Sequence, residues 1–173
     1  VSISTSLGLV THDYTQWPMF AQIWILFLGS FLACSGSTGG GIKMMRAMIL
    51  YKQVFREIVR SLHPNAVRPV RMGRNPVPEN ILHAVLGFSF MYMVSIVSLT
   101  LVLSATGLDL LTAFSAVVAC LNNTGPGLES VGPASNYQGL GDFHKWVLCF
   151  AMILGRLEIF TFLVVLTPTF WRR

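Results

Sequence analysis

Two short stretches of small and polar residues carry groups that can bind a cation. They are Ser4-Thr5-Ser6-Leu7-Gly8 near the start and Asn122-Asn123-Thr124-Gly125 in the second half of the chain. Loops of this kind replace the water shell of an ion with backbone carbonyls and hydroxyls, as ion-selectivity filters do. Glycine permits the backbone angles that aim carbonyls inward. We therefore predict ion-binding loops here; the alternative is ordinary surface loops with turn glycines.

A third stretch interrupts an apolar run that ends at Ala33, and reads Ser35-Gly36-Ser37-Thr38-Gly39-Gly40-Gly41. Each glycine costs a helix about 1 kcal/mol relative to alanine, so these residues should not be helical. At membrane depth, irregular backbone is tolerated only inside protein or beside water. We expect a broken membrane helix, a feature typical of ion and substrate sites. The alternative is a helix-ending loop at the membrane surface.

The last apolar run contains two charged residues, Arg156 and Glu158. Residues at positions i and i+2 of a helix point to different sides, so these two should not simply pair. A charge near the bilayer centre is expensive and usually faces the protein interior. We predict that Arg156 binds the carbonyls of the broken stretch 35–41; a structural salt bridge elsewhere is the alternative.

The composition is that of a membrane protein, with 53% hydrophobic and 11% charged residues among 173. The placement of charge predicts its orientation. Eight of the twelve basic residues lie between Lys43 and Arg74, and two more end the chain. By the positive-inside rule, residues 43–79 and the C-terminus are cytoplasmic. The loops around Asp13 and over 129–145 then face outward.

Periodicity predicts an all-α membrane protein with three spanning helices, the first broken by the glycine-rich loop, and one re-entrant helix. The run from Met19 is the first span, and 42–61 is an amphipathic helix that lies on the membrane or packs on a partner. Residues 109–121 form a helix capped by Asp109. At about a dozen residues it is too short to cross a membrane, which needs about 20. The other predicted segments are a linker over 61–79, a span over 81–106, a filter over 122–127 and the last span over 146–170.

The order of polar loop, outer loop and span occurs twice. Asp13-Tyr14-Thr15-Gln16-Trp17 and Asp142-Phe143-His144-Lys145-Trp146 share the pattern Asp-aromatic-x-x-Trp. The predicted repeat is span, pore helix, polar loop, span, with one complete copy over 80–173 and the second half of another over 1–60. Two loops cannot close a ring around an ion. Because the chain also opens at Val1 inside a polar loop, we expect a fragment of a longer protein.

The remaining residue types suggest no catalytic or metal-binding chemistry, so we expect no enzyme. Cys34, Cys120 and Cys149 have no metal-ligand spacing and are predicted to be free, buried thiols. Gly36 to Gly41 has the glycine spacing of a phosphate-binding loop. That motif requires lysine directly after the second glycine, where this chain has Ile42. Nucleotide binding is therefore a poor alternative.

Three long motifs carry a family resemblance: CSGSTGGGIKMMR over 34–46, NNTGPGLESVGPASN over 122–136 and ILGRLEIFTFLVVLTPTFW over 153–171. They resemble the C-terminal part of the TrkH family, the membrane subunits of bacterial Trk potassium-uptake systems in the Trk/Ktr/HKT superfamily. The resemblance covers essentially the whole chain. It implies four span–pore–span repeats around one pore in the inner membrane.

By this resemblance, residues 1–8 are the third filter and 122–127 the fourth, with potassium bound only at filter residues. The implied potassium ligands are Thr5, Ser6, Leu7, Gly8, Asn122, Asn123, Thr124 and Gly125. The stretch Ser35–Gly41 would be the intramembrane gating loop, held by Arg156. Leu7 departs from the family pattern, which has serine or threonine there, so it would contribute only its backbone.

The resemblance also implies a homodimer, the remaining repeats and a cytosolic nucleotide-binding regulatory subunit of the TrkA type as partners, besides membrane lipids, and no nucleic acid. It leaves channel-like flux and potassium–proton symport both open. The alternative function is a non-conducting membrane scaffold. The expected activity is potassium uptake through the filters and the gating loop, with no covalent cofactor.

Overall fold

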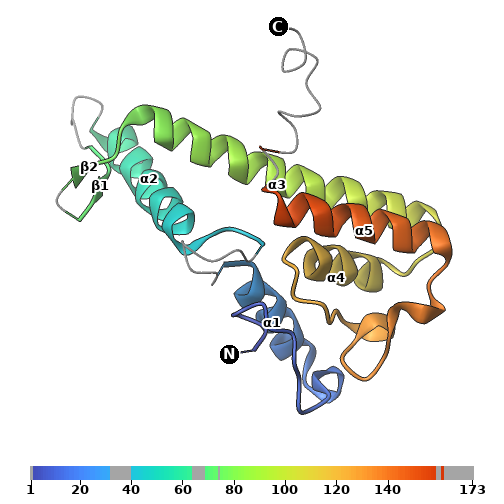
Figure 1. Cartoon of the computed structure of the whole chain (residues 1–173). Coiled ribbons are helices and arrows are strands. Elements are labelled where there is room, and N and C mark those ends of the chain that lie inside the picture. The colour runs from blue at the N-terminus through green and yellow to red at the C-terminus, as the bar shows by residue number, and fades with distance from the viewer. Residues whose placement is uncertain (1, 32–39, 64–68, 74, 159–160, 162–173) are drawn as a thin grey trace, which may run out of the picture.

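The computed structural model describes residues 2–31, 40–63, 69–73, 75–158 and 161, and the fold is mostly helical (Figure 1). The main helices are α1 (Met19–Phe31), α2 (Met44–Leu62), α3 (Glu79–Ala105), α4 (Leu110–Leu121) and α5 (Asp142–Arg156). Short 3-10 turns η1 (Tyr14–Gln16), η2 (Glu129–Val131) and η3 (Tyr137–Gly139) lie in the connecting loops. Two two-residue strands, β1 (Arg71–Met72) and β2 (Asn75–Pro76), form a small hairpin.

Helix α3 is the longest element, and α5 runs beside its C-terminal half with α4 packed against both (Figure 1). At 27 residues, α3 is the one helix in the described part of the chain that is long and apolar enough to cross a membrane. Helices α1 and α4 are apolar but shorter. The predicted class of helical membrane protein therefore agrees with the structure.

Helix α4 lies at the centre of the fold. The side chain of Asp109 accepts a hydrogen bond from the backbone amide of Leu111 at 3.1 Å, so the helix begins where the capping rule places it. Nine of its twelve residues are buried, many of them alanine or other small residues. Small side chains let neighbouring helices approach closely. Gly155 of α5 shows this, because a Cβ there would collide with the carbonyl oxygen of Leu121.

Helix α2 packs one face on the first half of α3. Ile49 is buried there with Leu82 and Val85, while Phe55 and Ile58 on another face stay exposed. The second half of the predicted linker 61–79 contains a small element of regular structure. The β1–β2 hairpin forms there because Gly73 adopts φ +64° at its turn and Val70 is buried against α2 and α3.

Helix α5 differs from the predicted span over 146–170. It begins four residues early, at Asp142, whose charge suits a helix N-terminus. It ends at Arg156, because Glu158 has φ +56°, an angle that a right-handed helix cannot contain. The rest of the predicted span, apart from Thr161, lies outside the described residues.

Two smaller expectations are also corrected. Trp17 follows a 3-10 turn before α1, whereas Trp146 lies inside α5, so the shared Asp-aromatic-x-x-Trp pattern has two different structures.

Cys120 is a free, buried thiol as predicted, but Cys149 is exposed on α5. An apolar membrane-facing surface and a buried core have similar composition, so the sequence does not separate these two cases. Cys34 lies outside the described residues.

Candidate functional site

The C-terminal end of α4 turns directly into the second predicted filter stretch. The amide of Asn123 donates to the carbonyl of Cys120 at 3.1 Å, and the amide of Thr124 donates to the carbonyl of Ala119 at 2.9 Å. Asn123 has φ +55°. This pair of bonds around a left-handed residue is the Schellman arrangement that ends many helices, and asparagine tolerates the left-handed position. The stretch is therefore held rigidly at a helix end.

The first predicted filter stretch has the same backbone arrangement. The amide of Ser6 donates to the carbonyl of Ile3 at 3.2 Å, and the amide of Leu7 donates to the carbonyl of Ser2 at 2.9 Å. Ser6 has φ +58°, close to the angle of Asn123. Two stretches more than a hundred positions apart thus share one local geometry, and Ser6 corresponds to Asn123.

A glycine follows each of these residues by two positions, and both glycines are left-handed: φ is +74° at Gly8 and +94° at Gly125. The two stretches lie side by side, because a Cβ on Gly8 would collide with the carbonyl oxygen of Thr124. A pocket of about 580 Å³ is lined by Leu7 and Gly8 of one stretch and by Thr124 and Gly125 of the other. The structure therefore brings the two predicted stretches together at one opening.

Several of the predicted ligands use their side chains in hydrogen bonds within the fold. The hydroxyl of Thr124 donates to the backbone carbonyl of Ala119, and the hydroxyl of Thr5 donates to the backbone carbonyl of Ser2, both at 3.2 Å. Asn122 is 1% exposed with its amide hydrogen-bonded. Leu7 is 64% exposed but has no polar side-chain atom. The side-chain oxygen of Asn122 is therefore already used as an acceptor, whereas the threonine hydroxyls keep oxygen lone pairs that can bind a cation alongside backbone carbonyls.

Two tyrosines brace the second stretch, and the sequence gives no direct signal for either. Tyr14 donates its hydroxyl to the carbonyl of Gly127 at 2.8 Å, and Tyr137 donates to the carbonyl of Gly125 at 2.7 Å. Burial raises the pKa of Tyr14 to about 12, with a smaller contribution from the charge of Asp13. A tyrosine with the ordinary pKa near 10 is already protonated at neutral pH. The raised pKa of Tyr14 extends to higher pH the range in which its hydroxyl remains a donor.

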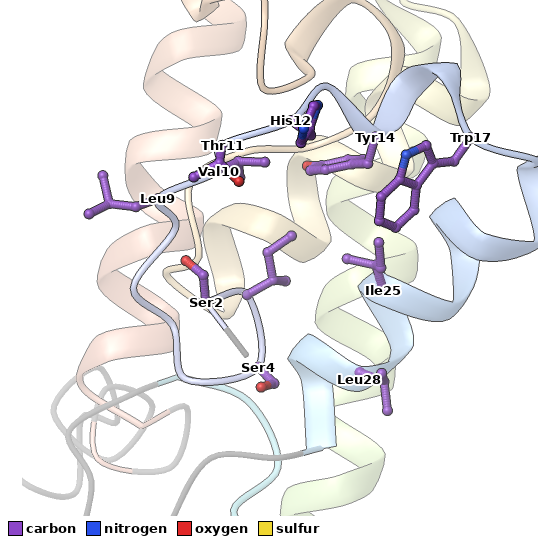
Figure 2. A pocket seen from close by; sticks show the side chains of 11 residues that line it. Ser2, Ser4, Leu9, Val10, Thr11, His12, Tyr14, Trp17, Ile25 and Leu28 are labelled. Atoms are coloured by element: carbon purple, nitrogen blue, oxygen red, sulfur yellow. The ribbon is translucent and has the colours of Figure 1, made fainter.

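A second pocket, of about 490 Å³, lies between the first stretch and α1 (Figure 2). Ser2 and Ser4 line it from the turn before Gly8, and Ile25 and Leu28 line it from α1. Figure 2 shows Tyr14 and Trp17 on the loop that leads from the stretch into α1. Helix α1 and this loop therefore lie next to the first stretch, across this pocket.

Of the glycine-rich stretch 35–41, the structure describes only Gly40 and Gly41. A Cβ on Gly40 would lie 2.5 Å from the carbonyl oxygen of Leu121. Gly41 has φ +83°, and a Cβ there would lie 2.5 Å from the Oδ1 atom of Asn122. The end of the stretch therefore packs directly against the end of α4. Ser35, Gly36, Ser37, Thr38 and Gly39 lie outside the described residues.

The charged residues around this junction are paired through Glu158. Its carboxylate contacts the Nζ atom of Lys43 and an Nη atom of Arg46, both at 2.7 Å. The guanidinium of Arg46 also lies 4.2 Å from the ring centre of Phe88. The spacing in the sequence indicates that Glu158 does not simply pair with Arg156. It does not indicate that the partners of Glu158 are Lys43 and Arg46. Arg156 is exposed at the end of α5, and its predicted partner lies largely outside the described residues.

Comparisons with known proteins identify the family of this chain. The sequence pattern of the TrkH family, described as cation transport protein, matches residues 1–172. The chain belongs to the TrkH family. This confirms the resemblance carried by the three long motifs.

Individual TrkH-family proteins match almost the whole chain. It is 47% identical over 172 residues to the Trk system potassium uptake protein TrkH of Vibrio parahaemolyticus, covering 99% of this chain and 35% of that protein. It is 45% identical to TrkH of Escherichia coli, with the same coverage. The crystal structure of the potassium transporter TrkH from Vibrio parahaemolyticus superposes with a TM-score of 0.90 at 46% identity, over 99% of this chain and 36% of that one. The chain thus spans about a third of these relatives.

Proposed function

We propose that this chain is the C-terminal part of a pore-forming subunit that carries potassium into the cell through a Trk-type system. It would supply the third and fourth filters, over 1–8 and 122–127. Its three spanning helices would start in α1, α3 and α5, with α4 as the re-entrant pore helix. The rest of the pore would come from the repeats that this chain does not contain.

The observation that carries the proposal is the shared geometry of the two filter stretches. Both follow the same pair of hydrogen bonds, both have left-handed residues two positions apart, and both line one opening. A pore built from repeats needs equivalent carbonyls at equivalent positions around an axis. A scaffold has no such need, so this equivalence favours transport over the scaffold alternative.

The test is potassium uptake by the full-length protein that contains this chain. Expressed in bacteria that lack their own potassium-uptake systems, it should restore growth at low potassium and rubidium-tracer uptake. Surface-loop changes such as Gln138→Ala should leave uptake intact. A well-expressed protein that restores neither growth nor uptake would favour the scaffold.

We further propose that Ser35–Gly41 is the gate and that Arg156 binds its carbonyls. The packing of Gly40 and Gly41 against Leu121 and Asn122 supports this position for the gate. Arg156→Gln should change open probability in single-channel recordings of the full-length protein. Unchanged opening in a well-expressed variant would contradict the role of Arg156.

The proposed setting is the bacterial inner membrane, with residues 43–79 and the C-terminus on the cytoplasmic side. The proposed partners are a second copy of the subunit and a cytosolic nucleotide-binding subunit of the TrkA type. The names of the relatives, which describe a Trk system, support a multi-component assembly. Co-purification of the full-length protein with such a subunit tests this part.

A further inference from the structure

Three polar side chains from three helices meet beneath the fourth filter stretch. Tyr92 of α3 donates its hydroxyl to the Oδ1 atom of Asn122 at 2.9 Å. The Nδ2 atom of Asn122 donates to the hydroxyl of Ser30 of α1 at 3.0 Å. The Ser30 hydroxyl in turn donates to the carbonyl of Leu26 at 3.1 Å. The amide of Asn122 is thus used on both sides by the protein.

The cluster is almost completely shielded from solvent. Asn122 is 1% exposed, Tyr92 2% and Ser30 9%. Hydrogen bonds in such a low-dielectric setting are strong, and an unpaired member is costly. The three side chains therefore fix the end of α4 relative to α1 and α3.

The end of the glycine-rich stretch, at Gly40 and Gly41, lies against this same cluster. The amide of Ile42 donates to the carbonyl of Ser30 at 3.0 Å. A Cβ on Gly41 would lie 2.5 Å from the Oδ1 atom of Asn122 and 2.9 Å from the carbonyl oxygen of Ser30. Ile42 is 1% exposed. The backbone of 40–42 therefore rests on the cluster with no room for a side chain at Gly41.

We infer that Ser30, Tyr92 and Asn122 form a polar relay that couples the fourth filter stretch to the end of the gating loop. Asn122 is the first residue of that stretch and also the surface on which Gly41 packs. Its side chain is a positioning group and not an ion ligand. The role of these three side chains in transport rests on the proposed function.

The relay is tested in the full-length protein with two conservative changes and two matched controls. Ser30→Ala removes the hydroxyl that accepts a hydrogen bond from Nδ2 of Asn122. Tyr92→Phe removes the hydroxyl that donates to Oδ1 of Asn122. Ser95→Ala is the control for the first, because the Ser95 hydroxyl also donates four residues back along its helix, to Met91 at 2.8 Å. Tyr51→Phe on the exposed side of α2 is the control for the second.

Potassium flux without the regulatory subunit should rise about three- to tenfold in Ser30→Ala and Tyr92→Phe, as expected for the loss of one buried hydrogen bond. The reason is that the end of the gating loop is released from the filter. The two changes should be non-additive when combined, because they break one network. The potassium-to-sodium permeability ratio should stay closer to wild type than the flux, because the backbone bonds at Asn123 and Thr124 remain.

Hydrogen exchange at the amide of Ile42 provides a readout that does not depend on transport. Exchange should accelerate in both relay variants and not in the two controls. Unchanged exchange in the relay variants, or flux effects equal to those of the controls, would overturn the inference. If the wild-type protein carried no potassium while the exchange effect appeared, the proposed function would fail and the structural coupling would stand.

Discussion

Gly8 shows how much a single residue contributes to the candidate filter. Its φ of +74° is unfavourable for any residue with a Cβ, by about 1–2 kcal/mol. A Cβ would also collide with the carbonyl oxygen of Thr124. We therefore expect Gly8→Ala to lower rubidium-tracer uptake by about tenfold or more, since each 1.4 kcal/mol is about a factor of ten.

The matched control for Gly8→Ala is Gly139→Ala, because a Cβ on Gly139 would meet no atom within 4 Å. Both variants should be compared at equal amounts in the membrane. Uptake by Gly8→Ala at the level of Gly139→Ala would show that the left-handed backbone at position 8 does not matter for transport.

Tyr137 provides a second test at the scale of one residue, because its hydroxyl binds one carbonyl of the candidate filter. Removing a hydrogen bond costs about 1 kcal/mol on average. Tyr137→Phe deletes the 2.7 Å bond to the carbonyl of Gly125 and leaves the ring in place. We expect the potassium-to-sodium permeability ratio, measured from reversal potentials, to fall about two- to tenfold. An unchanged ratio would mean that the carbonyl of Gly125 is positioned without this tyrosine.

At the scale of elements, Glu158 ties the end of α5 to the start of α2 through Lys43 and Arg46. Exposed ion pairs contribute about 1 kcal/mol or less, and breaking a fully buried pair costs about 3–5 kcal/mol. The Glu158 side chain is 36% exposed, so we expect the energetic contribution of its ion pairs to lie near the lower end of this range. We expect Glu158→Gln to destabilise the protein by about 1–2 kcal/mol.

Thermal unfolding of the purified full-length protein in detergent measures this effect. High salt should narrow the difference between Glu158→Gln and wild type, because salt screens partly exposed charges. The control is Glu57→Gln, whose carboxylate meets Arg56 at 3.5 Å with half of the side chain exposed. Equal stability of the two variants would show that the contact between α2 and α5 is held by other groups.

At the scale of the whole molecule, the positive-inside rule assigns the two ends of α3 to opposite sides of the membrane. In a background without the native cysteines, Gln138→Cys in η3 should react with a membrane-impermeant maleimide in intact cells. Ser61→Cys at the end of α2 should react only after permeabilisation. Both positions are exposed in the structure. The reverse pattern would contradict the proposed orientation.

Local rules were sufficient for much of the fold and for the location of the candidate site. The cap at Asp109 and the apolar run behind it place α4 over Leu110–Leu121, as observed. Glycine and small polar residues mark the two candidate filter stretches, because glycine tolerates the left-handed angles found at Gly8 and Gly125. Hydrophobic runs likewise mark where α1 and α3 lie.

What only the tertiary structure decided depends on residues far apart in the chain. Ser30 and Asn122 are 92 positions apart, and Lys43 and Glu158 are 115 apart. No spacing rule links such pairs, so the amide of Asn122 looks like an ion ligand in the sequence but is occupied in the fold. The burial of Val70 against Ile49 and Leu82, beside the β1–β2 hairpin, belongs to the same class. Composition and periodicity determined most of the helices and the positions of the candidate filter stretches, whereas packing decided which polar side chains hydrogen-bond to one another within the protein.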